Sequence, residues 1–298
     1  MMITIQNSAL TVKIDSLGAQ LASVRTPDKT EYLWQGNPNI WSRRAPILFP
    51  LIGRLKDKSY LLDGKPYTIS THGFARDMEF EVIGQEENRV SFQLTDTPET
   101  LAVYPFSFLL TVTYSLKDNQ LTKTHEVYNR SQQDMLYELG AHDGFRVPVG
   151  DGITMADYTV RLPGLDSVRL YGMDEQLMLT PKGEAIPLTQ SALPLTPASF
   201  GLDTMILDSP PQAQAVLCGK AGHPRVMLSF PDFPYLGIWT QGKPFDTGYV
   251  CIEPWSSLPD GAFMGRELGD KPGIRRLAPG QREVLSYTTT IYPEEKEC

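Results

Sequence analysis

The stretch 106–116 constrains the fold more than any other part of the sequence. Every even-numbered position in it carries a large apolar side chain, and most odd-numbered positions are polar. Alternation with a period of two is typical of a β-strand that buries one face. Similar alternation over 78–82, 90–94 and 285–291 predicts further strands. The chain is therefore predicted to be rich in β-strands.

Two turn sequences connect predicted strands into hairpins. Asp63 and Gly64 suit a tight hairpin turn, and residues 117–119 close a second hairpin. Because Pro66 cannot donate a ladder hydrogen bond, we expect the strand that returns from the first turn to lie at an edge or to start late.

Helical signals are few, and the best of them is short. Residues 203–207 lie between turn-rich segments, so we expect at most one or two helical turns there. The proline-rich region 181–211 is expected to form an insertion or a rim loop. Many strands without β-α-β alternation predict an all-β fold, a large antiparallel β-sandwich with few short helices. Because no linker sequence interrupts the pattern, we predict a single domain over 1–298.

The charge balance excludes one class of partner. The chain has 35 acidic and 27 basic side chains and a net charge of -8. Proteins that bind the phosphate backbone need a surplus of Lys and Arg along one face, so no nucleic-acid partner is expected.

Cysteine usage and the absence of long apolar runs predict the compartment. The three cysteines, Cys218, Cys251 and Cys298, are widely spaced, which gives neither a disulfide framework nor a paired-cysteine metal motif. Residues 1–10 lack the basic and continuously apolar regions of a signal peptide, and no uncharged apolar stretch of about 18 residues follows. We expect a cytoplasmic protein without membrane association, and either a monomer or a homodimer.

Two of the four histidines stand in similar settings between predicted strands. His72 precedes Gly-Phe-Ala-Arg, and His142 precedes Asp-Gly-Phe-Arg. Such loops often carry functional residues, but an imidazole in a turn can equally satisfy a backbone group, and both interpretations stay open at this point. His125, within an alternating strand, and His223, within a turn-like segment, favour a structural interpretation.

The carboxylate of Glu253 has an unusual position. It follows the apolar run 249–252 and precedes Pro254, so it is expected at a strand end beside Trp255. Partial burial there would raise its pKa toward the range of a general base, whereas a salt bridge at the rim is the alternative. The rings of Trp239, Trp255 and Phe263 could give flat faces for a sugar, or could simply belong to the core.

Taken together, these sequence tracts resemble a known family. His-Gly-Phe-Ala-Arg at 72–76, Gly-Ala-His-x-Gly-Phe at 140–145 and Cys-Ile-Glu-Pro-Trp at 251–255 occur in the order and spacing of the aldose 1-epimerase (galactose mutarotase) family. The tracts at 17–21 and 46–54 are also similar to that family, so the resemblance spans nearly the whole chain. It is strongest to the LacX-like branch.

This resemblance implies a β-supersandwich with a sugar site on the concave face of a sheet, and neither a cofactor nor a metal. The implied reaction interconverts the α and β anomers of a hexose through ring opening, rotation about C1–C2 and ring closure. By the resemblance, Glu253 is the base that takes the proton of the C1 hydroxyl, and His142 is the acid that protonates the ring oxygen.

The resemblance also assigns substrate-binding residues. His72 corresponds to the histidine that holds the ring oxygen and the C1 region, and Arg54 to an arginine that binds sugar hydroxyls. Asp203 matches the aspartate that holds sugar hydroxyls, with Asp208 as an open alternative. Arg76 is expected at the rim of the site.

One departure from the family pattern concerns the residue after His142. Related sequences usually have proline there, whereas this chain has Asp143. A carboxylate that faces the imidazole would favour protonated His142, while one that points away would leave it unchanged.

Alternatives to a mutarotase of free hexoses remain. The segment 43–58 has five basic residues against one aspartate, a net charge of +4, which could meet a sugar phosphate or could be a solvated loop. A hexose-6-phosphate mutarotase is therefore the nearest alternative enzyme. A non-catalytic carbohydrate-binding or sensing protein has less need of an acid–base pair, and glycoside hydrolysis would need a second carboxylate beside the bond.

Overall fold

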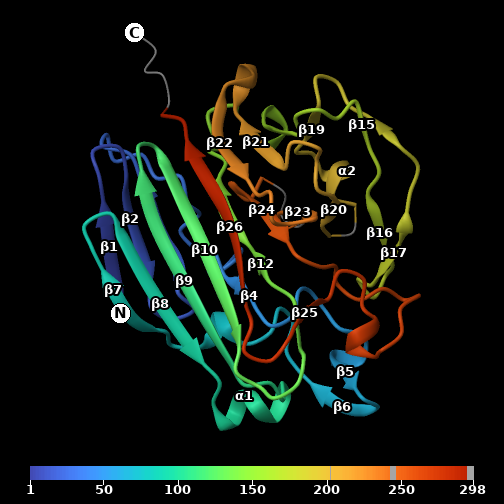
Figure 1. Cartoon of the computed structure of the whole chain (residues 1–298). Coiled ribbons are helices and arrows are strands. Elements are labelled where there is room, and N and C mark those ends of the chain that lie inside the picture. Colours follow the sequence, from blue (N-terminus) through green and yellow to red (C-terminus); the bar gives the residue numbers. More distant parts are fainter. Residues whose placement is uncertain (202, 242–245, 294–298) are drawn as a thin grey trace.

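The computed structural model describes residues 1–201, 203–241 and 246–293. Two large antiparallel sheets dominate it (Figure 1). The first has nine strands, in the spatial order β19 (Ala192–Pro194), β14 (Thr159–Arg161), β21 (Gln214–Cys218), β22 (Pro224–Ser229), β26 (Arg282–Ile291), β10 (Gln120–Asn129), β9 (Phe108–Lys117), β8 (Arg89–Thr95) and β7 (Glu81–Gln85).

The second large sheet has eight strands and carries the candidate site. Its main path runs β17 (Leu179–Lys182), β16 (Tyr171–Met173), β20 (Met205–Asp208), β23 (Tyr235–Trp239), β24 (Tyr249–Trp255), β12 (Gly140–Ala141) and β4 (Ile47–Leu48), and β13 (Asp143–Arg146) also pairs with β24. The apolar faces of the two large sheets share one core cluster, so the fold is the predicted antiparallel β-supersandwich.

Smaller sheets and short helices complete the described part of the chain. The small sheets are β1 (Met2–Gln6) with β2 (Thr11–Asp15) and β3 (Gln20–Arg25), β5 (Ser59–Leu62) with β6 (Lys65–Thr68), β11 (Met135–Tyr137) with β25 (Arg275–Leu277), and β15 (Ser167–Val168) with β18 (Ile186–Pro187). The helices are α1 (Pro98–Val103), α2 (Pro197–Phe200) and the 3₁₀ turns η1 (Lys56–Lys58), η2 (Ala75–Asp77), η3 (Met155–Asp157), η4 (Lys220–Gly222) and η5 (Leu268–Asp270). None of these helices has the length and apolar character needed to cross a membrane.

The predicted hairpins and strand faces are confirmed. Side chains along β9 alternate between buried and half-buried, and β9 and β10 are joined at residues 118–119. The turn between β5 and β6 uses positive φ angles of 51° at Asp63 and 75° at Gly64, and Pro66 lies in this separate two-stranded hairpin. The strand expected over 78–82 begins later, because β7 starts at Glu81.

The prediction of helical turns over 203–207 is wrong, because residues 205–208 form strand β20. Residues of β20 pair with β23 in the eight-stranded sheet, and the side chains of Met205, Ile206 and Leu207 are all buried there. The helical turn lies earlier, in α2, where the Thr196 side chain caps the helix by accepting the backbone N–H of Ser199. Burial on both faces favours a central strand over a short helix with one apolar stripe.

The proline-rich region is not simply a rim loop either. It contains β18, β19, α2 and β20, which contribute strands to both large sheets. The region is therefore part of the two large sheets and not an insertion outside them. Asp203 lies two residues before the start of β20.

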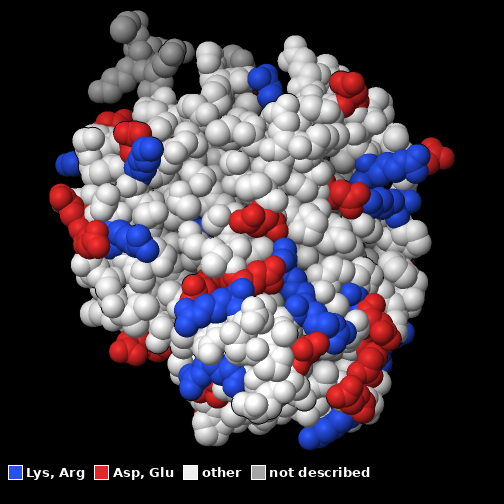
Figure 2. Space-filling view, viewed as in Figure 1, with Lys and Arg blue, Asp and Glu red and all other residues white. Residues whose placement is uncertain are grey.

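Basic and acidic side chains mix on the surface. On the face seen in Figure 2, Lys and Arg side chains lie next to Asp and Glu side chains. This mixed pattern agrees with the acidic net charge of -8 and gives no support on that face to a basic stripe for nucleic acid.

Candidate active site

Strand pairing brings His142 and Glu253 together. In the antiparallel pairing with β24, Gly140 lies opposite Trp255 and Asp143 lies opposite Ile252. Because both pairs share one register, His142 stands across from Glu253, at the break between β12 and β13. Two residues that are far apart in sequence therefore become neighbours on one face of the sheet.

The alternation of β24 decides which side chains face the site. All seven of its residues are buried. Odd positions, including Cys251, Glu253 and Trp255, share the face opposite to that of Val250 and Ile252, which join the apolar core between the sheets. The apolar run noted in the sequence thus has one face in the core and the other face beneath a cavity.

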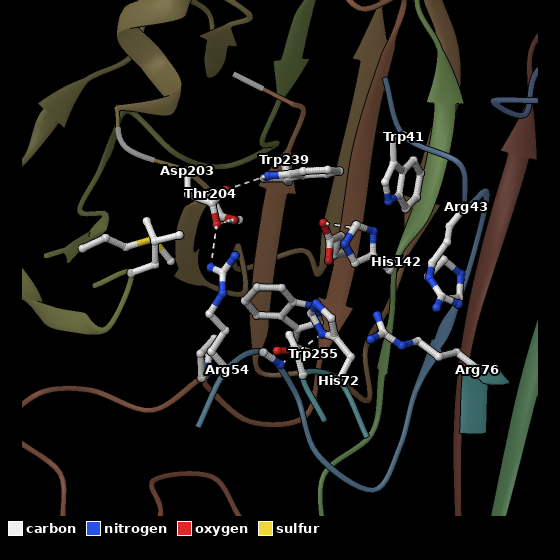
Figure 3. Close-up of a pocket in the computed structure, with 17 residues that line it drawn as sticks. Trp41, Arg43, Arg54, His72, Arg76, His142, Asp203, Thr204, Trp239 and Trp255 are labelled. Carbon is white, nitrogen blue, oxygen red and sulfur yellow. Dashed lines mark hydrogen bonds and ion pairs between the residues drawn. The ribbon is translucent and has the colours of Figure 1, made fainter. Parts of the chain in front are cut away.

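All seven residues predicted for the site line one cavity of about 190 Å³. They are Glu253, His142, His72, Arg54, Asp203, Arg76 and Trp255. A cavity of this size suits a small molecule rather than a polymer. Figure 3 shows His142 between two groups of charged side chains, Arg54 with Asp203 on one side and Arg43 with Arg76 on the other.

Two tryptophans fix the imidazole of His142. Trp41 stacks on it with ring centroids 5.0 Å apart, and Trp239 meets it edge-on at 5.4 Å (Figure 3). Burial lowers the pKa of His142 to about 3, and the positive charges of Arg76 and Arg43 act in the same direction. The ring is therefore neutral near pH 7 when the cavity contains no sugar.

The carboxyl group of Glu253 is fully buried, and its Oε1 lies 3.5 Å from Nδ1 of His142. Burial raises the pKa of Glu253 well above its usual value, and the carboxylate of Asp203 adds to the rise, while the indole of Trp255 opposes it. Because the two groups lie this close together, His142 and Glu253 are coupled and titrate as one pair.

His72 is held as a neutral hydrogen-bond donor. Its Nδ1 accepts the backbone N–H of Gly53 at 3.1 Å, so the remaining hydrogen is on Nε2. Burial lowers the pKa of His72 well below 6.5, with further lowering from His142 and from nearby arginines. The following Gly73 has a φ of 72°, and a Cβ there would lie 2.2 Å from the carbonyl oxygen of Phe49, so only glycine fits behind the histidine.

Asp203, rather than Asp208, belongs to the cavity. The indole N–H of Trp239 donates to Oδ1 of Asp203 at 2.9 Å, and Arg54 lies 3.7 Å from Oδ2 (Figure 3). Asp208 instead contacts Lys182 and accepts the Tyr171 hydroxyl hydrogen at 3.1 Å, outside this cavity.

Two arginines form the opposite wall. Arg43 and Arg76 both line the cavity, and both contact Asp77, at 2.7 Å and 3.5 Å. Burial and the charge of Arg43 lower the pKa of Arg76. Arg44, the other arginine of the basic segment, donates to the backbone carbonyl of Gln35 at 3.0 Å and does not line the cavity.

Sequence reasoning missed Trp41 and Thr204 as lining residues and placed Arg43 only as part of a basic segment. Trp41 lies in an irregular segment without alternation, so no local signal marks it. Of the aromatic rings that the sequence offers as faces for a sugar, Trp239 lines the cavity, whereas Phe263 does not and is 57% exposed.

Asp143 points away from the imidazole of His142. Its carboxylate is fully buried and accepts hydrogen bonds from Lys123 at 3.0 Å and from Tyr287 at 2.6 Å, both on the nine-stranded sheet. Of the two orientations left open by the sequence, the structure has the one that faces away.

The remaining histidines have the structural positions favoured by the sequence. His125 is fully buried within β10 and stacks on Tyr287 with centroids 6.1 Å apart, and His223 follows the short turn η4 at the surface. Among the cysteines, Cys218 and Cys251 are unpaired and buried, and Cys298 lies outside the described residues.

One set of potential metal donors lies in the site. Ligand atoms of His142, Cys251 and Glu253 lie within 4.8 Å of one another. Burial and the charges of Glu253 and Asp143 raise the pKa of the Cys251 thiol well above its usual value. A metal bound here would have to displace that thiol proton.

The fold is a β-supersandwich, and its eight-stranded sheet carries a small cavity lined by charged and aromatic side chains. The family profile described as aldose 1-epimerase matches residues 1–265. The chain belongs to the aldose 1-epimerase family, as the sequence tracts indicated.

Relatives with similar full-length sequences support this membership. The chromosomal LacX protein of Lactococcus lactis subsp. lactis is 31% identical over 98% of this chain and 99% of its own length, and the plasmid LacX protein is 32% identical with the same coverage. The crystal structure of a galactose mutarotase related enzyme from Lactobacillus acidophilus superposes with a TM-score of 0.93 at 32% identity and covers 100% of this chain and 99% of that one. The family membership and these neighbours support a mutarotase-type function on a sugar, which places the protein among carbohydrate isomerases.

Proposed function

We propose that this protein is an aldose 1-epimerase that interconverts the α and β anomers of a hexose by acid–base ring opening and closing. Glu253 acts as the base and His142 as the acid. We also propose that the chain is one domain over 1–298, that it works in the cytoplasm and that it needs no cofactor or metal.

One observation carries the proposal. Five buried polar atoms of cavity residues have no partner at good hydrogen-bond geometry: both carboxyl oxygens of Glu253, Nδ1 of His142, Nε1 of Trp255 and Nε of Arg76. Their nearest partners are long contacts within the site, with Nδ1 of His142 3.5 Å from Oε1 of Glu253 and Nε of Arg76 3.5 Å from Asp77. Buried polar groups are normally satisfied, so unpaired ones around a small cavity point to a ligand rich in hydroxyl groups. A hexose supplies donors and acceptors around its whole ring.

The pair of His142 and Glu253 supplies the proton movements of the reaction. In the sugar-bound site, the pair holds one proton, and this proton is transferred to His142. The carboxylate of Glu253 then takes the proton from the C1 hydroxyl while His142 protonates the ring oxygen, and the C1–O5 bond breaks to give the aldehyde. Rotation about C1–C2 and the reverse proton transfers close the ring as the other anomer. Each positioned acid or base contributes about 10²–10⁴-fold, which is adequate for a reaction that already proceeds slowly in water.

The other residues position the sugar. The Nε2 hydrogen of His72 points to a role at the ring oxygen and C1, while Arg54 and Asp203 hold hydroxyl groups on the far side of the ring. The indole faces of Trp41, Trp239 and Trp255 exclude water and offer apolar surfaces to the C–H groups of the sugar.

Anomer exchange measured by NMR tests the proposal directly. The wild type should accelerate equilibration of α-galactose or α-glucose, and Glu253→Gln and His142→Asn should each lose about 10²-fold or more. A folded wild type that binds these sugars without accelerating exchange would contradict the enzymatic proposal and favour a carbohydrate-binding or sensing protein.

A phosphorylated hexose is a second candidate substrate, because Arg43 and Arg76 place two guanidinium groups against one carboxylate, Asp77, at the cavity wall. Such a pair suits a bound phosphate. Exchange of glucose 6-phosphate should then be selectively slowed by Arg43→Gln, while the matched variant Arg44→Gln, outside the cavity, should have no effect. Equal losses with free and phosphorylated sugar would assign Arg43 to the general binding of the ring.

A further inference from the structure

Trp41 links the imidazole of His142 to a column of stacked aromatic rings. The rings of His142 and Trp41 are stacked with centroids 5.0 Å apart, those of Trp41 and Tyr249 with centroids 5.3 Å apart, and those of Tyr249 and Trp34 with centroids 4.7 Å apart. Burial raises the pKa of the Tyr249 hydroxyl above its usual value, so that ring stays neutral. His142 is therefore the member of this column that can carry a positive charge.

The absence of a side chain at Gly144 makes room for the indole of Trp41. Gly144 lies on β13, just beyond His142, and a Cβ placed on it would be 2.8 Å from Cζ3 of Trp41 and 3.1 Å from the carbonyl oxygen of Arg44. That first distance is shorter than packed carbon atoms allow. The indole thus occupies the space beside His142 that a side chain on this strand would fill.

The backbone that carries Trp41 is tied to the same strand. The indole N–H of Trp34 donates to the carbonyl oxygen of Trp41 at 2.8 Å. The backbone N–H of Trp34 donates to the carbonyl oxygen of Gly144 at 2.8 Å, and the backbone N–H of Gly144 donates to the carbonyl oxygen of Arg44 at 2.9 Å. These bonds hold the irregular segment 34–44 at both ends, so the protein itself holds the indole against His142 (Figure 3).

A stacked face separates Trp41 from the other rings around His142. Among the rings that the structure describes there, Trp239 and His72 meet the imidazole edge-on, at interplanar angles of 77° and 84°, whereas Trp41 lies at 27°. An indole is the best aromatic partner for a cation that lies over its face within about 6 Å of its centroid. The stack of Trp41 on His142 therefore has the geometry of a cation–π contact whenever the imidazole is protonated.

The proposed mechanism needs this protonated imidazole, and the charges in the cavity act on it in opposite directions. Glu253 favours a positive charge on His142 from 3.5 Å, whereas Arg43 and Arg76 disfavour it. The thiol of Cys251 also lies nearby and stays neutral, because burial raises its pKa. An indole face that attracts a cation offsets part of the repulsion by the arginines.

We propose that Trp41 is a positioning residue that stabilises the protonated form of the acid His142 through a cation–π contact and thereby raises kcat. This inference rests on the proposed mutarotase function and gives Trp41 a role that acts through His142 and not only through the sugar. In the transition state the proton is on its way to the ring oxygen, so His142 keeps part of its positive charge. An interaction that is stronger with this charge than with the neutral imidazole lowers the barrier.

Replacing the indole tests the contact through the split between kcat and KM. Trp41→Leu removes the aromatic face, so kcat should fall roughly three- to tenfold, a part of the effect of a full, desolvated cation–π contact. Trp41→Phe keeps a weaker aromatic face and should retain more of kcat than Trp41→Leu. In the His142→Asn background, Trp41→Leu should cost no further kcat, because the group that it acts through is gone.

Fluorinated tryptophan separates the aromatic face from the shape of the ring. Fluorine atoms on the indole withdraw electrons from its face with little change in size, so they weaken a cation–π contact and leave packing almost unchanged. The chain has four tryptophans, so Trp41→Phe labelled in the same way is the matched control. With each added fluorine kcat should decrease in the wild-type sequence, at a nearly constant KM, and should stay the same in the control.

The outcomes separate this inference from the proposed function. A graded loss of kcat in the wild-type sequence and none in the labelled control would establish it, even if Trp41→Leu does not fold. A kcat that does not respond to fluorine, a response of equal size in the control, or a loss that persists in the His142→Asn background would overturn it. A rise in KM alone would also overturn it and assign Trp41 to the sugar. In all these cases the wild type accelerates exchange, whereas a folded wild type without exchange activity would refute the proposed function and this inference with it.

Discussion

Replacing Asp203 by asparagine tests whether this carboxylate holds the sugar. The substitution keeps an oxygen that can accept the indole N–H of Trp239, now 2.9 Å away, but removes the charge that faces Arg54. The side chain is 25% exposed, so its interactions are only partly screened by water.

The expected magnitude follows from hydrogen-bond energies. A hydrogen bond to a charged acceptor contributes about 1.5–3 kcal/mol and a neutral one about 0.5–1.5 kcal/mol, so one sugar hydroxyl loses about 1–1.5 kcal/mol. That loss corresponds to an increase of about tenfold in KM for a substrate in rapid equilibrium. Because the Asp203 charge contributes to the raised pKa of Glu253, its removal should also move the acid limb of the pH profile to lower pH.

The assay is anomer exchange by NMR over a range of sugar concentrations and pH values. Asp208→Asn is the matched control, since Asp208 is 56% exposed and lies outside the cavity, and it should change neither KM nor the acid limb. An unchanged KM in Asp203→Asn, or an equal increase in both variants, would refute the assignment of Asp203 to the sugar.

Two further predictions concern stability. Burial lowers the pKa of His125 to about 3 from 6.5, so the unfolded chain binds a proton that the folded chain does not, and stability falls as the pH drops below about 6.5. His125→Phe should therefore reduce the difference in unfolding free energy between pH 6.5 and pH 5 by about 2 kcal/mol in urea titrations, and an unchanged difference would contradict burial of a neutral imidazole. Gly73→Ala should lower the melting temperature much more than Gly64→Ala. Both glycines have a positive φ, but only at Gly73 would a Cβ meet backbone atoms. Equal decreases in melting temperature would show that the backbone around residue 73 moves to make room for the Cβ.

Local patterns predicted the strands well because alternation is a property of single strands. The buried even positions of β9 and the turn at Asp63 and Gly64 follow directly from the sequence. The helix expected over 203–207 failed because burial of β20 between β16 and β23 is a tertiary effect that overrides local propensity.

The site could be predicted only in part for the same reason. The sequence motifs identified the residues that line the cavity. The register that places His142 opposite Glu253, however, depends on pairing between strands that are distant in sequence. Trp41 comes from an irregular segment and reaches His142 only in the folded chain. The orientation of Asp143 follows from alternation once His142 is known to face the cavity, which shows that a strand assignment can resolve a question that a motif leaves open.

The central claim is that His142 and Glu253 act as one acid–base pair on the anomeric centre of a sugar. The most direct test compares exchange rates of a hexose by NMR for the wild type, Glu253→Gln, His142→Asn and the double variant, all confirmed to be folded. Residues that act as a unit give non-additive losses, so each single variant should lose about 10²-fold or more and the double variant should be hardly slower than the worse single variant. Single variants that retain nearly full exchange, or losses that multiply in the double variant, would contradict the account.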